Sequence, residues 1–373
     1  MGKSVKISVL HVILLCMTVI GLKNHVTILP PILEVGHRDG WLSVLLGAVI
    51  VLPWLFLLAF IAKSTDGQPL IKIIEEKNGK TIARIIKFIV VIEFFLFGAF
   101  TMIEMLQWVN TTFLPFTPML VLFVLYFILC MMLAIYGLQA IMIANVLVLF
   151  VVIILGFFVA IANLRVKDYT LLLPILEKGM EPVLLATVFP MSGFLELGFL
   201  IFIQHHVKNR IKFKHFALML LLLLGLTMGP LIGAIVEFGP DEASKQRYPA
   251  YEEWALVAIG EYINHLDFLS IYQWMTGAFV RIGFYLFLVT EILSIEQQSK
   301  KVWTYVAPPF AIICLSLMLV DQQVYLFLNN YLFLIFSCCL LVVLGIVIAL
   351  LVWRKKGQRQ EELHHADRGD HIK

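Results

Sequence analysis

Long apolar runs separated by short polar loops dominate this 373-residue chain. A membrane-spanning helix needs about 20 mostly apolar residues to cross the hydrocarbon core. The runs predict ten such helices, at Ser8 to Leu33, Trp41 to Ala62, Ile82 to Trp108, Met119 to Tyr136, Ala140 to Asn163, Val183 to Ile203, Phe216 to Glu237, Phe268 to Leu293, Val302 to Val320 and Tyr331 to Trp353. We therefore expect an all-α integral membrane protein.

Composition and charge placement agree with this class. The chain is 61% hydrophobic and 14% charged, against about 45–50% apolar and 25% charged residues in soluble domains. A formal charge of +3 is too small to indicate a nucleic-acid partner. With the N-terminus inside, inner loops and ends hold 18 Lys and Arg and outer loops hold 6, so both termini are predicted to be cytoplasmic. Residues 1–353 would form the membrane domain, and the charged tail 354–373 would be disordered.

The ten helices divide into two sets of five, residues 8–163 and 183–353. An odd number per set makes the second set enter from the opposite face, so homologous halves would be inverted repeats. The first helix of each set contains helix-breaking residues: Gly21, Pro30 and Pro31 in one, and Pro190, Gly193 and Gly198 in the other. We expect helices 1 and 6 to be broken, although Gly and Pro are also ordinary in membrane helices.

Six charged residues lie at depth within the predicted helices: Lys23, Glu93, Glu104, Glu196, Arg281 and Glu291. Lys23, Glu93 and Arg281 are nearest the midplane, where a charge costs about 2.5–3.5 kcal/mol on insertion scales. Lys23 or Arg281 is expected to pair with Glu93 or Glu104, either as a ligand or proton site or as a structural ion pair. Glu196 and Glu291 are predicted to reach water near the cytoplasmic side.

Enzymatic and metal sites find little support. The HExxH, GxxxxGK[ST] and GxSxG motifs are absent from the sequence, so we predict neither catalysis nor a cofactor. The adjacent His205 and His206 lack the i, i+3 or i, i+4 spacing of helical metal ligands, and they are predicted to be solvated. All five cysteines lie in apolar segments and are interpreted as small hydrophobic residues.

Two loops are predicted to contain amphipathic helices. Pro69 to Lys77 places Leu70, Ile73 and Ile74 on one face and charges on the other, which is typical of an interfacial helix. Tyr251 to Ile263 is acidic and contains aromatic residues suited to the headgroup region. This second helix could cap the outer mouth of the bundle.

Three stretches carry a family resemblance: GLKNHVTILPPILEVGHRDGWLSVLLG from Gly21, LLLPILEKGMEPVLLATVFPMSGFLEL from Leu171 and QWMTGAFVRIGFYLF from Gln273. Together they resemble the B subunits of bacterial endospore germinant receptors, the spore permease family of the amino acid-polyamine-organocation superfamily. The resemblance implies a LeuT-like 5+5 inverted repeat, with a small nutrient between helices 1 and 6 and flanked by helices 3 and 8. The implied ligand-binding residues are Gly21, Leu22, Lys23, Asn24, His25, Phe97, Thr101, Glu104, Ser192, Gly193, Phe194 and Arg281.

The resemblance also implies a function. Such a subunit would sense a nutrient, an amino acid before a sugar or nucleoside, together with receptor A and C subunits in the spore inner membrane. Lys23 and Arg281 would repel a cation at the site that holds sodium in relatives, so we expect sodium-independent binding. The alternatives are a proton-coupled amino acid transporter and an assembly subunit that binds no nutrient.

Overall fold

The computed structural model describes residues 6–258 and 266–353. Ten helices in this part are long and apolar enough to cross a membrane, which confirms the predicted number. Backbone polar groups cannot bond to water in hydrocarbon, so helices that satisfy their own hydrogen bonds are the expected solution. The tail 354–373 and the end of the predicted helix to Ile263 lie outside the described residues.

The first half of the chain contains the following helices, in which η marks a 3₁₀ or π segment: α1 (Val9–Leu22), η1 (Lys23–Thr27), α2 (Leu29–Gly36), η2 (His37–Asp39), α3 (Gly40–Ser64), α4 (Leu70–Asn78), α5 (Lys80–Thr112), α6 (Met119–Tyr136), α7 (Leu138–Ala162), η3 (Asn163–Val166) and η4 (Tyr169–Leu172). The second half contains α8 (Glu181–Ala186), α9 (Val188–Phe194), η5 (Leu195–His206), α10 (Phe213–Phe238), α11 (Pro240–Ala243), α12 (Pro249–Ala255), α13 (Leu269–Ile292), α14 (Ser299–Tyr305), α15 (Ala307–Met318), α16 (Gln322–Phe327), η6 (Leu328–Phe333) and α17 (Leu334–Trp353). The described residues contain no β-strand.

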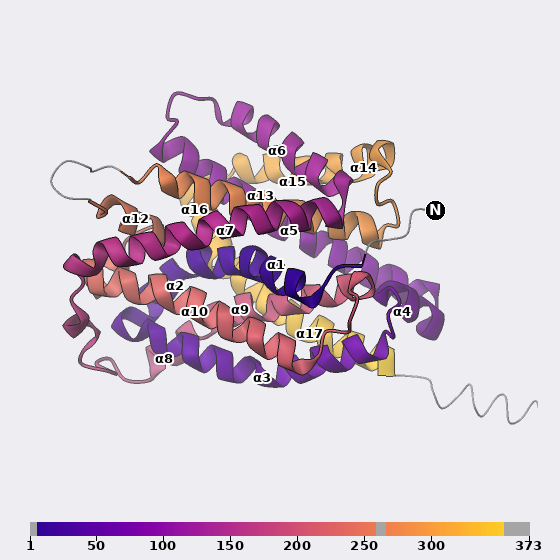
Figure 1. Cartoon of the computed structure of the whole chain (residues 1–373), viewed down its shortest axis with the longest axis horizontal. Helices are drawn as coiled ribbons and strands as arrows, with labels where there is room; N and C mark the ends of the chain where they lie inside the picture. Colours follow the sequence, from indigo (N-terminus) through magenta and orange to yellow (C-terminus); the bar gives the residue numbers. More distant parts are fainter. Residues whose placement is uncertain (1–5, 259–265, 354–373) are drawn as a thin grey trace, which may run out of the picture.

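The helices form one bundle with two distinct ends (Figure 1). One end, called the α4 end, holds α4 and the last turn of α17, where Lys77 donates to the carbonyl of Val352 at 2.6 Å. The start of the first span is also fixed to the end of η5, because the Ile7 amide donates to the His206 carbonyl at 2.9 Å. The opposite end, called the α12 end, carries α12.

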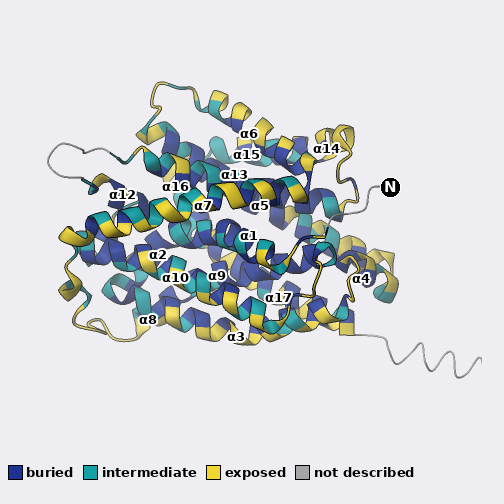
Figure 2. Cartoon of the chain, in the orientation of Figure 1, coloured by how far each residue is buried: buried dark blue, intermediate teal, exposed yellow. Residues whose placement is uncertain are grey.

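Burial separates central from peripheral helices (Figure 2). The spans that contain η5 and α13 are the most buried, whereas the α7 span is the least buried. Large apolar side chains at intervals of three and four cover the outward face of α7: Ile143, Leu147, Phe150, Ile154, Phe157 and Ile161. Such a stripe is expected of a helix face that meets lipid.

The two predicted loop helices are present in altered form. In α4, Leu70, Ile73 and Ile74 form the predicted apolar face, and this face is buried against the bundle. In the outer loop, α12 ends at Ala255, and its aromatic residues do not lie outward. Tyr251 stacks on Trp274 with ring centroids 4.6 Å apart, and Trp254 donates to Gln273 at 2.9 Å. The helix therefore packs into the end of the bundle.

Candidate ligand-binding site

The irregularity in helix 1 follows from its two prolines. Pro30 and Pro31 lack an amide hydrogen and their rings crowd the carbonyls one turn earlier, so the regular ladder cannot continue through them. The helix widens instead: η1 is a π segment in which the Ile28 amide donates to the Lys23 carbonyl at 3.2 Å. The predicted break is a change of helix type, and Lys23 lies at its start.

Helix 6 changes to the tighter 3₁₀ form, whereas helix 1 widens to a π segment. From Leu195 to His206 it is a 3₁₀ helix, in which side chains three residues apart align on one face. Glu196, Phe199, Phe202 and His205 therefore share a line along η5. Both irregular segments place ionisable side chains where neighbouring helices meet.

Glu196 lies at the centre of a buried charged cluster, here called the Glu196 cluster. Its Oε1 is 2.9 Å from Lys23 Nζ, and its Oε2 is 2.9 Å from Arg281 Nη1. Tyr285 Oη donates to the same Oε2 at 2.8 Å. All three charged side chains are at most 3% exposed. Both carboxylate oxygens of Glu196 therefore face donors, as a buried carboxylate requires.

Other helices hold the two cations in place. Lys23 Nζ also donates to the Ser192 carbonyl at 3.1 Å, and Arg281 Nε donates to Thr101 Oγ1 at 3.1 Å. Arg281 additionally donates to the carbonyl of Val19. The cluster thus joins α1, η1, α5, α9, η5 and α13 in one network.

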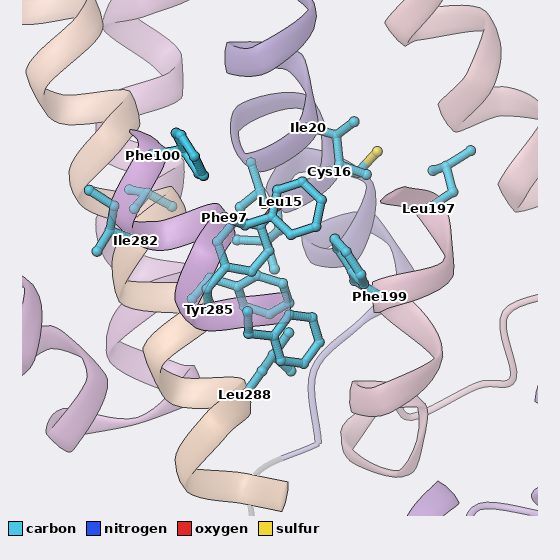
Figure 3. Close-up of a cluster of buried hydrophobic side chains, with 14 of the residues drawn as sticks. Leu15, Cys16, Ile20, Phe97, Phe100, Leu197, Phe199, Ile282, Tyr285 and Leu288 are labelled. Atoms are coloured by element: carbon cyan, nitrogen blue, oxygen red, sulfur yellow. The ribbon is translucent and has the colours of Figure 1, made fainter. Parts of the chain in front are cut away.

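Aromatic rings border the Glu196 cluster. Phe97, Phe199 and Tyr285 face one another, with centroids 5.2–5.7 Å apart (Figure 3). Lys23 Nζ lies 5.1 Å from the Phe97 centroid and the Arg281 guanidinium 4.9 Å from that of Tyr285. Ring faces attract cations, so the aromatic wall stabilises the positive charges while it excludes water.

The Glu196 cluster has more positive than negative charge. Two cations, Lys23 and Arg281, share one carboxylate. Glu93 is one helical turn from Phe97 on α5, but both of its oxygens are buried without a hydrogen-bond partner among the described residues. An anion that entered the cluster would therefore meet cations that are already desolvated and oriented.

The predicted ion pairs are wrong. Lys23 and Arg281 pair with Glu196, not with Glu93 or Glu104, and Glu196 is fully buried although it was expected to reach water. Glu104 accepts a hydrogen bond from Thr27 at 2.9 Å. The error has a physical origin, since the sequence gives approximate depth but not the direction in which a side chain points.

The remaining predicted residues form two groups. Asn24, Gly193 and Phe194 are buried beside the Glu196 cluster, and Asn24 Nδ2 donates to Thr227 Oγ1 at 3.2 Å. Gly21, Leu22 and His25 instead line a mainly apolar cavity of about 800 Å³ between α1, α7, α10, α12 and α13. The structure thus brings Lys23, Phe97, Thr101, Ser192 and Arg281 together and places the cavity-lining group on another side of helix 1.

Gly193 is required by the close approach of η1. A β-carbon at this position would lie 2.8 Å from Asn24 Cγ and overlap its Oδ1. We expect Gly193→Ala to destabilise the protein by about 1–3 kcal/mol through overpacking. Thermal melting of the detergent-solubilised protein would measure the loss, and the double variant with Asn24→Ala should recover most of it. An unchanged melting temperature in Gly193→Ala would contradict this packing.

The α12 end carries a buried acid, Glu253. Burial and the neighbouring Glu237 carboxylate raise the pKa of the Glu253 carboxyl well above its usual range. The folded state therefore keeps a proton that the unfolded state loses above the ordinary glutamate pKa, and stability falls as pH rises from about 4.3 toward the raised value. Glu253→Gln should flatten this decline in melting temperature, whereas Glu242→Gln on exposed α11 should retain it. Parallel pH profiles of all three proteins would contradict the assignment.

His205 and His206 are not solvated as predicted. Both imidazoles lie against Glu291, at 2.8 and 3.1 Å, and their side chains are 11% and 23% exposed. Glu291 is itself only 14% exposed, so it is far less exposed to water than predicted. The partner comes from α13, 85 or more residues away, which spacing within helix 6 cannot indicate.

Sequence reasoning missed Glu196 and Tyr285 as members of the site. A signal for Glu196 was present, because it is the one charged residue between Glu181 and the two histidines of helix 6. Tyr285 follows Arg281 by one helical turn. No sequence signal pointed to the Val19 carbonyl.

Ten spanning helices around a desolvated charged cluster define a multi-pass membrane protein of permease-like type. A family model described as "Spore germination protein" matches residues 6–325, and the chain belongs to this spore permease family. It is 36% identical to spore germination protein XB of Bacillus anthracis over 342 residues, which are 91% of this chain and 96% of that protein. It is 26% identical to YfkT of Bacillus subtilis (strain 168), a protein named for spore germination, over 79% of this chain and 81% of that protein. The resemblance inferred from the sequence is confirmed.

Proposed function

We propose that this membrane protein is the nutrient-sensing subunit of a spore germinant receptor. The observation that carries the proposal is the Glu196 cluster, in which two buried cations share one carboxylate. A carboxylate-bearing nutrient, most simply an amino acid, would supply the missing anion, and charge-assisted hydrogen bonds would orient it. The aromatic rings of Phe97 and Tyr285 would contact its apolar part.

The same proposal includes the finer points of architecture and assembly. We infer a LeuT-like inverted relation between the two five-helix halves, because helices 1 and 6 both change type beside the Glu196 cluster. The α4 end would be cytoplasmic, in agreement with the distribution of Lys and Arg. Receptor A and C subunits in the spore inner membrane would receive the signal.

Exchange of subunits tests the proposal. This chain would replace the corresponding subunit in a receptor of different nutrient preference, and germination would be followed by the loss of optical density. Preference should follow this chain. If preference stays with the other subunits although the hybrid receptor is present in normal amounts, the nutrient does not bind here.

A proton-coupled amino acid transporter is the second candidate. The observation that favours it is Glu93, a carboxyl buried in the membrane domain without a hydrogen-bond partner among the described residues. Such intramembrane carboxyls are common proton carriers. Uptake of radiolabelled amino acids by the purified chain in vesicles, driven by a proton gradient and lost in Glu93→Gln, would favour transport over sensing.

Nutrient binding is expected to be independent of sodium. Lys23 and Arg281 place two positive charges between helices 1 and 8, and like charges disfavour a bound cation there. Binding of the effective amino acid to the purified protein should change less than about twofold when choline replaces sodium. A loss of binding in choline would contradict this prediction, and potassium serves as the control for a general cation effect.

A further inference from the structure

A second polar cluster lies at the α4 end of the seam between η5 and α13. His205 Nε2 is 2.8 Å from Glu291 Oε1, and His206 Nε2 is 3.1 Å from Glu291 Oε2. The two imidazole rings are 4.1 Å apart. One ligand atom from each of these three residues lies within 4.8 Å of the others, so the groups converge on one point.

This convergence is not explained by hydrogen bonding alone. His205 pairs with Glu291 as a hydrogen bond, but His206 Nε2 and Glu291 Oε2 are buried and make no hydrogen bond within the described residues. Buried polar atoms are nearly always satisfied, and an exception calls for a missing water or ion. The 3.1 Å between these two atoms meets the distance of an ion pair but not the geometry of a hydrogen bond, and a metal ion bound by both atoms would satisfy them.

We infer that His205, His206 and Glu291 bind a divalent transition-metal ion, with zinc the best match. Imidazole nitrogen and carboxylate oxygen are preferred zinc ligands, and bonds of about 2.0–2.2 Å place neighbouring ligand atoms roughly 3.3 Å apart. The two imidazole–carboxylate separations of 2.8 and 3.1 Å approach this value, and the ligand atoms of the two histidines lie within 4.8 Å of each other. Magnesium and calcium prefer all-oxygen sites.

The surroundings of the three side chains suit a metal site with one open coordination position. A cavity of about 260 Å³ borders His205 and Glu291 and is also lined by Phe202 and by Lys72 of α4. It leaves room for a water or an exogenous ligand as the fourth group on the metal. The backbone of the histidine pair is held from outside the site as well, since the His206 carbonyl accepts a hydrogen bond from the Ile7 amide at 2.9 Å.

The position of the site gives it a structural consequence. Glu196 and His205 lie on the same 3₁₀ face of η5, and Arg281 and Glu291 both lie on α13. A metal at the α4 end would join the same two elements that the Glu196 cluster joins further in. Occupancy would therefore oppose separation of η5 from α13 at that end.

A zinc titration of the purified full chain in detergent, without an affinity histidine tag, tests the inference. The wild type should bind one high-affinity equivalent of Zn²⁺ and melt at a higher temperature with it. Glu291→Gln and His206→Asn should each weaken that step at least tenfold. His215→Ala, which changes a histidine outside the cluster on α10, should leave it unchanged.

Two results would overturn the inference. One is the absence of a saturable high-affinity step in the wild type, and the other is equal Zn²⁺ affinity in the wild type and both cluster variants. If a variant melts at a lower temperature than the wild type even without metal, the absorption spectrum of Co²⁺ added to the wild type is the deciding measurement. A tetrahedral absorption spectrum supports the site, and the spectrum of the free hydrated ion refutes it.

Discussion

Glu196→Gln is expected to destabilise the folded membrane domain by about 3–5 kcal/mol, because removal of one partner leaves buried charges uncompensated. Lys23 and Arg281 would keep the neutral amide oxygen but lose their shared anion. The change is close to isosteric, so packing around the site should be preserved. Thermal melting and monodispersity of the detergent-solubilised protein would measure the effect.

A matched control variant separates the effect of losing a buried carboxylate from the effect of losing any paired carboxylate. Glu177→Gln removes a carboxylate that also pairs with an arginine, Arg38 at 2.9 Å, but Glu177 is 49% exposed. Surface pairs contribute about 0–1 kcal/mol, so this variant should melt close to the wild type. Equal melting temperatures for Glu196→Gln and Glu177→Gln would show that the Glu196 cluster does not carry the expected energy.

The number of unpaired charges left in the Glu196 cluster gives a second check of its contribution to stability. Glu196→Gln leaves both cations of the cluster without a carboxylate, whereas adding Lys23→Met to it removes one of those cations. The double variant should therefore be more stable than Glu196→Gln alone. Such non-additivity is expected of residues in direct contact, and simple addition of the two effects would argue against a shared network.

The helices were predictable because the membrane imposes one rule on every span. About 20 apolar residues cross the hydrocarbon core, and the limits of Met119 to Tyr136 agree with α6 residue for residue. The place of the irregularity in helix 1 was also predictable, since Pro30 and Pro31 break the ladder at a fixed offset. Its form, a π segment at Lys23–Thr27, depends on neighbouring helices.

The pairing of charges was not predictable in the same way. Depth can be counted along a helix, but which helices face each other depends on tertiary packing. Glu196 lies in a segment that its neighbours bury on every side, and its partners lie 173 positions earlier and 85 later in the chain. His205 and Glu291 illustrate the same limit, because each residue alone resembles an ordinary polar helix end.

Lys23→Met is expected to preserve the fold and to impair the response to nutrient. The change leaves Arg281 and Glu196 as a neutral pair, with Nη1 and Oε2 2.9 Å apart, so no uncompensated charge remains in the cluster. A hydrogen bond to a charged group contributes about 1.5–3 kcal/mol. If Lys23 binds the nutrient carboxylate, the nutrient concentration for half-maximal germination should rise about 10- to 100-fold.

Three comparisons give this prediction its force. The amount of the variant in spore membranes should equal that of the wild type. Lys23→Arg should respond at lower nutrient concentrations than Lys23→Met, and Lys80→Met at the exposed start of α5 should behave as the wild type. A receptor that assembles normally with Lys23→Met and responds at the wild-type nutrient concentration would mean that Lys23 only stabilises the bundle. The nutrient carboxylate would then have to meet Arg281 or bind elsewhere.

Lys23 already bonds to the Ser192 carbonyl and to Glu196. A nutrient that displaced either bond would therefore alter the contact between helices 1 and 6, which is the change a sensor must transmit.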